Sequence, residues 1–375
     1  MTLRCSILWL ATCVLFFHNC TREKTASENK NATAPPASFY KHFEGRIGEY
    51  AITLDLTATD SMFTGSYYYN KIGMPLQLEG KMQPENKFYL MVRNDEGAVV
   101  ESFNGIFVDS DSLKGEWTDK RKNKALKFYL ITAMEDIAEC SNLHFERKNC
   151  EHAEKMKKLP PDSLQWDSDT ACTKLELDLL KVKLKDQRIS DKINLYILKD
   201  VCEDKHRQDT SEILRAFLSR VDSAGDGGFE ESINVSLNFN DNMIFGVGVC
   251  WYSYGYGAAH PNSACHVLNF DTRNGKIILL ADILKPGFEN VLNPFAEKKL
   301  NSLYPEESWF FEPGEFKLNN DFAISPAGLT FDYDKYEIAS YASGGQELFL
   351  SFDEIKAWIK PGSVLDEWLK TKGKN

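Results

Sequence analysis

The side chains best suited to chemistry gather in one stretch, CWYSYGYGAAHPNSACHVLNFD, which runs from Cys250 to Asp271. Cys250, His260, Cys265 and His266 offer two thiols and two imidazoles, the ligand types that zinc prefers. Their spacing matches no standard zinc finger or ribbon, and a disulfide between the two cysteines is the alternative. We therefore predict neither a metal site nor a cofactor.

Catalysis has one candidate in this stretch, His260, which precedes Pro261. No nucleophile motif accompanies it, so pairing it with Asp271 or Asp282 would not complete a hydrolase site. Ser253 lies in Tyr-Ser-Tyr-Gly, which is not the turn that exposes a nucleophilic serine. We predict that the protein is not an enzyme. The alternative is a cell-envelope glycan hydrolase or transferase that uses His260.

The same stretch is better suited to recognition. Tyrosines alternate with small residues between Tyr252 and Asn262, and tyrosine gives a large contact area at a low entropic cost. A second aromatic loop begins at Trp309, where core packing is the stronger expectation. The predicted binding residues are Tyr252, Tyr254, Tyr256, His260, Asn262 and Trp309. The alternative is that the tyrosines fill the domain's own core.

The N-terminus has the pattern of an export signal. Residues 1–19 carry Arg4 and then an apolar run that is too short to span a membrane. The run ends before Cys20, as in a bacterial lipoprotein signal, although the residues before Cys20 are bulky. We predict acylation of Cys20 and a membrane-anchored protein of the bacterial cell envelope; secretion with Cys20 free is the alternative. Residues 20–38 are polar and predict a flexible tether.

The remaining chain predicts two folded domains. Residues 39–131 alternate apolar and polar positions, with turn signals about every ten residues, which favours an antiparallel barrel or meander. Residues 132–171 are interpreted as a connector. Residues 172–375 show helical and strand patterns in runs, which predicts an α+β domain with an antiparallel sheet. Its predicted helices include Asp191–Cys202 and one N-capped by Ser351.

Six of the nine cysteines lie beyond residue 20. An even number in an exported protein indicates disulfides, although six cysteines permit 15 pairings. We favour the local set, which pairs Cys140 with Cys150, Cys172 with Cys202, and Cys250 with Cys265. The last bond would hold the base of the aromatic loop.

The formal net charge of −11 argues against nucleic acid as a partner, because nucleic-acid binding needs a basic surface. An acidic surface instead attracts cationic proteins such as lysozyme. The alternative is that the acidity only maintains solubility.

The C-terminal half also resembles a known family. The segments that carry the resemblance are Tyr256–Asn262, Leu268–Asp271, Leu280–Ile283, Gly328–Phe331 and Tyr333–Ala339. In order and spacing they resemble the RsiV-like extracytoplasmic domain, over about Cys172–Trp358. That domain occurs in the anti-sigma-V factor, a lysozyme receptor, and in non-catalytic parts of a peptidoglycan deacetylase.

The resemblance implies an extracytoplasmic α+β module that binds something connected with the cell wall or lysozyme. The chain shows neither a sigma-factor-binding segment nor a deacetylase metal motif, so those two roles are not expected. We therefore expect a lipid-anchored binding protein that recognises lysozyme or a cell-wall component such as peptidoglycan. A purely structural envelope lipoprotein remains a further alternative.

Overall fold

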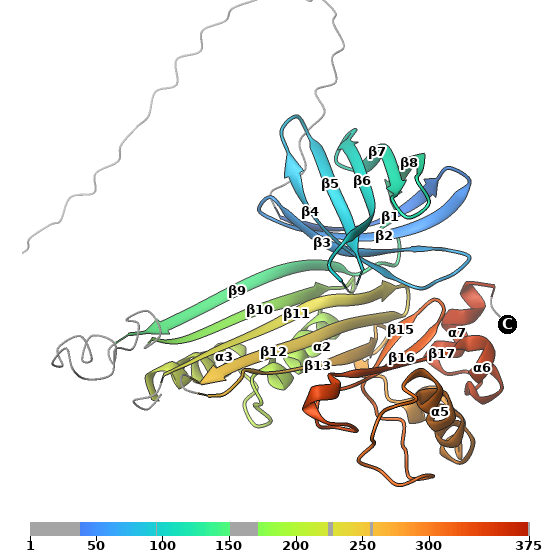
Figure 1. Cartoon of the computed structure of the whole chain (residues 1–375). Helices are drawn as coiled ribbons and strands as arrows, with labels where there is room; N and C mark the ends of the chain where they lie inside the picture. Colours follow the sequence, from blue (N-terminus) through green and yellow to red (C-terminus); the bar gives the residue numbers. More distant parts are fainter. Residues whose placement is uncertain (1–37, 95, 151–171, 224–227, 256–257, 374–375) are drawn as a thin grey trace, which may run out of the picture.

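The computed structural model describes residues 38–94, 96–150, 172–223, 228–255 and 258–373 (Figure 1). The predicted signal peptide, Cys20, the tether up to residue 37 and Tyr256 lie outside these residues. Within them, no helix combines the length and the apolar character needed to cross a membrane.

The N-terminal domain is a closed barrel of eight antiparallel strands, as the alternation predicts. Its strands are β1 (Phe39–Ile47), β2 (Tyr50–Thr59), β3 (Met62–Tyr69), β4 (Leu76–Gln83), β5 (Lys87–Arg93), β6 (Val99–Phe107), β7 (Ser112–Asp119) and β8 (Lys124–Thr132). Gly65 marks a close approach of two strands, since a Cβ there would lie 2.0 Å from the carbonyl oxygen of Asp55. Glycine at this position is required for the tight curvature of the wall.

Aromatic side chains fill the barrel. Phe43, Phe63, Phe103 and Tyr67 are at most 1% exposed. Tyr67 and Phe103 meet edge to face with ring centroids 5.1 Å apart. The Tyr67 hydroxyl donates to the buried carboxylate of Glu101, so the interior also contains a satisfied polar contact.

The second layer is a six-stranded sheet in the order β14-β13-β12-β11-β10-β9. Its strands are β9 (Glu139–Asn149), β10 (Thr173–Lys183), β11 (Phe229–Asp241), β12 (Ile244–Gly255), β13 (Asn262–Asp271) and β14 (Lys276–Ile277). The stretch predicted as a connector thus contributes a strand of the sheet, β9. The sheet is mixed, which corrects the antiparallel prediction.

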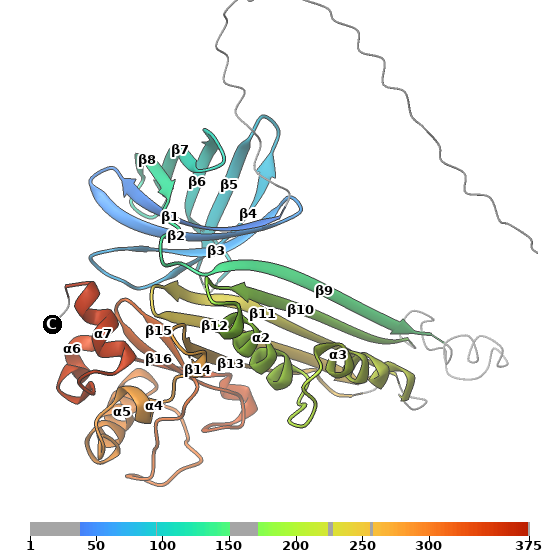
Figure 2. The same cartoon turned by 180° about the vertical axis from the view of Figure 1, so that it is seen from behind.

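The one parallel pair joins β10 to β11, because a helical crossover separates them in the chain. The crossover consists of α2 (Gln187–Val201), α3 (Thr210–Leu218) and the 3₁₀ helix η1 (Ser219–Ser223). Both α-helices pack on one face of the sheet (Figure 2). The opposite face, which we call the open face, is not covered by α2 or α3 and is the face seen in Figure 1.

A three-stranded sheet and short helices complete the fold beside β13. The strands are β15 (Phe322–Ser325), β16 (Gly328–Tyr333) and β17 (Gln346–Ser351). The helices are α4 (Leu280–Ile283), α5 (Glu289–Leu303), η2 (Tyr341–Ser343), α6 (Phe352–Ile355), η3 (Lys356–Trp358) and α7 (Val364–Thr371). Ser351 caps α6 through a capping box with Glu354, which confirms the predicted N-cap.

A buried polar node joins the barrel to the sheet. The carboxamide of Asn240 donates to the Tyr40 hydroxyl at 3.0 Å and to the carbonyl of Ala138 at 2.9 Å. Tyr40 in turn donates to Asp55 at 2.6 Å, and Asp55 also bonds His42 at 2.8 Å. Hydrogen bonds to Asp55 and Glu44 outweigh burial and raise the pKa of His42 to about 10. The barrel is therefore fixed to the sheet by specific polar contacts.

Candidate functional site

The aromatic stretch forms a β-hairpin that is closed by a disulfide. Cys250 on β12 lies opposite Cys265 on β13, and the two are disulfide-bonded with their Cα atoms 4.1 Å apart. This bond confirms the predicted pair and removes both thiols from the zinc alternative. Within the described residues, no group of three His, Cys, Asp or Glu side chains is arranged to hold a metal ion.

The other two predicted disulfides are wrong. Cys150 bonds Cys172, while Cys140 and Cys202 are free thiols. The strand register explains the difference, since Asn149 lies opposite Thr173 and Cys140 lies opposite Val182, at the far end of β9 and β10. The spacing of cysteines in the sequence does not show that β9 pairs with β10, so it could only favour cysteines close together in the chain.

Rings from two loops meet at the end of the hairpin. His260 packs against Tyr341 with ring centroids 4.4 Å apart, and Tyr336 lies 5.4 Å from Tyr341. The Tyr341 hydroxyl donates to the carbonyl of Pro261 at 3.3 Å. The Lys335 ammonium lies 5.1 Å from the centroid of the Tyr341 ring. We call His260, Tyr336 and Tyr341 the aromatic corner.

Two of these three residues were not among the predicted binding residues. Tyr336 and Tyr341 both follow β16. Tyr336 lies within the Tyr333–Ala339 segment of the family resemblance, whereas Tyr341 lies in none of its segments. Tyr336 is 59% exposed and adopts φ 70°, a conformation that ordinary residues rarely take. An exposed aromatic residue held at a positive φ is a candidate recognition residue. A signal in the sequence was the three tyrosines at positions 333, 336 and 341, but their spacing alone does not place them beside His260.

The predicted binding residues fall in different places. Tyr252 and Tyr254 are half-buried on β12, Asn262 is exposed at the start of β13, and His260 is exposed. Trp309 instead stacks on Phe311 beside the C-terminal core, and its indole donates to Asn301 at 2.6 Å. The structure therefore brings the hairpin residues together and places Trp309 in a packing role.

The contacts of His260 do not resemble those of a general base. Its Nδ1 lies 3.0 Å from the carbonyl of Pro261. The two carboxylates that could orient a catalytic histidine have other partners: Asp271 binds Arg273, and Asp282 accepts from the backbone of Leu279. Its ring is instead part of the aromatic corner.

Carboxylates cover the free edge of β13 next to the corner. Asp334 accepts from the Cys265 N–H at 3.3 Å, and Asp321 accepts from the Val267 N–H at 2.7 Å. These bonds satisfy backbone donors that β14 does not reach. Asp332 on β16, whose N–H donates to the carbonyl of Asp321, completes a group that we call the acidic edge.

Burial disfavours the charged form of the carboxylates in the acidic edge. Burial, then the neighbouring carboxylates, raise the pKa of Asp332 to about 6. Burial also raises the pKa of Asp321 to about 7, against the Val267 N–H, which lowers it. The pKa of His266 is raised by its 2.7 Å bond to Asp200. Carboxylates crowded in this way favour a nearby positive charge.

Comparisons with known proteins match part of this region to a family model. A family model described as a protein of unknown function (DUF3298) matches residues 281–353, so the C-terminal part contains a DUF3298 domain. A crystal structure of a DUF3298 family member from Bacteroides fragilis NCTC 9343 aligns over 62% of this chain and 98% of its own, with 16% identity and a TM-score of 0.50.

A second solved structure, a DUF3298 family protein from Pseudomonas aeruginosa PAO1, aligns over 61% of this chain and 97% of its own, with 20% identity and a TM-score of 0.45. No curated protein matches the chain. At 16% identity the Bacteroides structure supports a shared fold and gives no information on activity. The matched segment includes Tyr336 and Tyr341 and excludes the hairpin of Cys250 and Cys265.

Proposed function

We propose that this protein is a non-catalytic binding protein of the bacterial cell envelope, anchored by acylated Cys20, that recognises its partner through the aromatic corner. The observation that carries the proposal is the packing of rings from two separate loops, His260 against Tyr341 and Tyr341 against Tyr336, in which His260 and Tyr336 are exposed and Tyr341 is half-buried. Rigid exposed aromatics are the side chains that contribute most to protein recognition. The Cys250–Cys265 bond restrains the hairpin before binding, which lowers the entropic cost of association.

The partner that fits this surface best is a cationic protein, with c-type lysozyme as the first candidate. The chain carries a net charge of −11, and the acidic edge lies directly beside the corner. Negative charge around an aromatic contact accelerates the approach of a basic partner and makes it sensitive to salt. The sequence resemblance to a lysozyme-receptor domain supports the same candidate.

The two disulfides support the extracytoplasmic part of the proposal. Disulfides persist in exported proteins and are rare in reducing compartments. Labelling of Cys20 with a fatty-acid analogue in cells, lost in Cys20→Ser, tests the anchor. A signal that persists in Cys20→Ser would overturn the anchoring part alone.

The binding part is tested by titrating a soluble fragment of residues 39–375 with c-type lysozyme in low and high salt. We expect saturable binding that weakens as salt rises, because the charges steer the approach. Loss of lysozyme activity in the complex would identify an inhibitor. If lysozyme fails to bind at either salt concentration, it is not the partner.

A further inference from the structure

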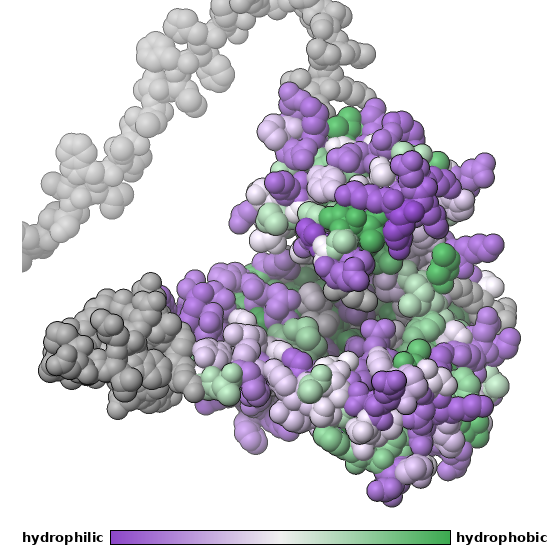
Figure 3. Space-filling model, viewed as in Figure 1, coloured by the Kyte–Doolittle hydropathy of each residue, from purple (hydrophilic) through white to green (hydrophobic). Residues whose placement is uncertain are grey.

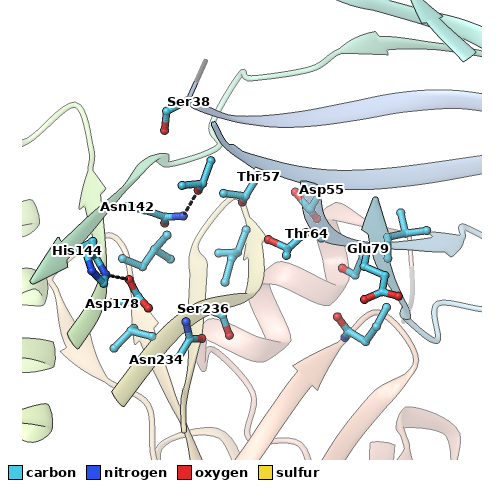
Figure 4. Close-up of a pocket in the computed structure, with 18 of the residues that line it drawn as sticks. Ser38, Asp55, Thr57, Thr64, Glu79, Asn142, His144, Asp178, Asn234 and Ser236 are labelled. Carbon is cyan, nitrogen blue, oxygen red and sulfur yellow. Dashed lines mark hydrogen bonds and ion pairs between the residues drawn. The ribbon is translucent and has the colours of Figure 1, made fainter. Parts of the chain in front are cut away.

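A cavity lies away from the aromatic corner, between the barrel and the open face of the sheet (Figures 3 and 4). Its volume is about 690 Å³, within the range of roughly 300–1,000 Å³ that is usual for small-molecule sites. One wall is the outer surface of β2, β3 and β4, and the other is formed by β9, β10 and β11. Asn142 joins the walls by donating to Thr59 at 3.1 Å.

The strand registers show which side chains share the sheet's open face. His144, Asp178, Asn234 and Cys250 lie directly opposite one another on β9, β10, β11 and β12. Opposed residues project from the same face of a sheet. The row therefore leads from the cavity across the sheet to the disulfide.

The charged groups of the cavity are already paired. Glu79 binds Arg93, His144 binds Asp178 at 2.7 Å, and Asp55 belongs to the node with Tyr40. The cavity has little unpaired charge to offer a ligand, so it does not select strongly for an ionic one.

Uncharged polar side chains also line the cavity. The following cavity side chains make no hydrogen bond to any other described residue: Thr57, Thr64, Ser66, Gln77, Asn234 and Ser236. Figure 4 shows Thr57 and Thr64 on the barrel wall, with Asn234 and Ser236 on the sheet. Hydroxyl and carboxamide groups both donate and accept hydrogen bonds. A sugar, whose hydroxyls do the same, satisfies both kinds of group from two sides.

The cavity continues along β11 and β12 toward an aromatic side chain. Ser236 lies opposite Gly248, and Ser232, further along β11, lies opposite Tyr252. At about 3.3 Å per residue, Ser236 to Ser232 spans about 13 Å. A Cβ at Gly248 would have only the Ser236 hydroxyl within 4 Å, at 3.6 Å, so this part of the face is open. Tyr252 provides an apolar ring beside the polar groups.

We propose that the cavity between the barrel and the sheet, with the adjoining face of β11 and β12, binds a neutral oligosaccharide chain. The hydroxyl and amide groups of both walls bond its hydroxyls, and Tyr252 packs against a sugar ring. The site is separate from the aromatic corner, so the test of this proposal does not depend on the protein partner proposed above.

The test uses residues 39–375 with chitotetraose, cellotetraose and maltotetraose, and with tetra-alanine as a peptide probe. Saturation-transfer NMR detects binding, and calorimetry measures its affinity. We expect at least one oligosaccharide to bind and tetra-alanine not to bind. Ser236→Trp fills the cavity and should lower that affinity at least tenfold. Ser141→Trp is the matched control, because Ser141 is an exposed strand serine opposite Lys181 on the other face.

Further variants keep the proposal testable if Ser236→Trp does not fold. Asn234→Ala and Thr64→Ala should each weaken binding by about 2- to 12-fold, the equivalent of one lost hydrogen bond. Tyr341→Ala should leave sugar binding unchanged. The proposal is overturned if none of the oligosaccharides binds, if only the peptide binds, or if folded Ser236→Trp binds as well as the wild type.

Discussion

The barrel and the six-stranded sheet use β-structure in opposite ways. The barrel is closed, so each strand pairs on both sides, and its inner surface is filled by aromatic side chains such as Phe63 and Phe103. The sheet has one face covered by α2 and α3 and the other only partly covered, with exposed polar residues such as Asn234. The barrel's inward-facing side chains serve stability, whereas the open face and its loops are available for recognition.

This contrast also separates two kinds of restraint. The barrel is held by burial, which needs no covalent bond, while both disulfides lie in the open sheet. Burial of apolar surface is the main source of stability in a closed core. An open hairpin gains less from burial, so a disulfide contributes a larger share of its order.

The largest expected effect comes from emptying the barrel. Phe103→Ala should lower the free energy of unfolding by about 3–5 kcal/mol, because it leaves a cavity among packed rings. Asn234→Ala, on the open face, should change it by less than about 0.5 kcal/mol. Urea unfolding followed by circular dichroism measures both. Equal losses would contradict the division between a stabilising core and an open face.

Removing the Cys250–Cys265 bond should have the next largest effect. The bond spans 15 residues of sequence, and a loop of that size corresponds to about 3 kcal/mol of stability. The variant with both cysteines changed to alanine should therefore unfold at lower denaturant, and it should bind the partner more weakly. Removal of Cys150–Cys172 is the control, since it should cost stability and leave partner affinity unchanged. Unchanged affinity in both variants would mean that the Cys250–Cys265 bond does not order the aromatic corner.

The junction of the two regions can be weakened at Asn240. Asn240→Ala leaves the Ala138 N–H and carbonyl without side-chain partners, and each unsatisfied buried group costs about 1–3 kcal/mol. Asn142→Ala removes only an exposed bond to Thr59 and should cost less than about 0.5 kcal/mol. Denaturant midpoints compare them. Similar costs would show that the buried node does not fix the barrel to the sheet.

The last prediction concerns pH. The pKa of Asp321 is raised from 3.8 to about 7 in the folded protein, so the folded state binds more protons than the unfolded state between these values. Stability is therefore highest below about pH 4 for this group and falls as pH rises to 7. Asp321→Asn still accepts from Val267 and should flatten this fall, measured as unfolding free energy between pH 5 and pH 8. An unchanged slope would assign the pH dependence to other groups, such as Asp332.

The sequence predicted the parts of the fold that depend on local pattern. The alternation of apolar residues predicted the barrel, and the Ser351 cap predicted the start of α6. It did not predict the parallel pairing of β10 with β11 or the bond between Cys150 and Cys172, because both depend on which strands become neighbours.

The site was predictable to a similar extent. Tyr252, Tyr254 and His260 could be identified because they lie in one short stretch. Tyr336 and Tyr341 could not, because folding brings them from the segment between β16 and β17. The cavity between the barrel and the sheet joins residues from two domains, and none of them forms a motif in the sequence.

The most direct test of the central claim compares three proteins in one lysozyme titration at low salt: residues 39–375 unchanged, with Tyr341→Ala, and with Phe310→Ala. Phe310 is the matched control, since it is 60% exposed and lies outside the corner. We predict at least a tenfold loss of affinity for Tyr341→Ala, as for a central aromatic contact (about 1.4 kcal/mol or more), and no change for Phe310→Ala. Equal affinity of all three folded proteins would contradict recognition through the aromatic corner.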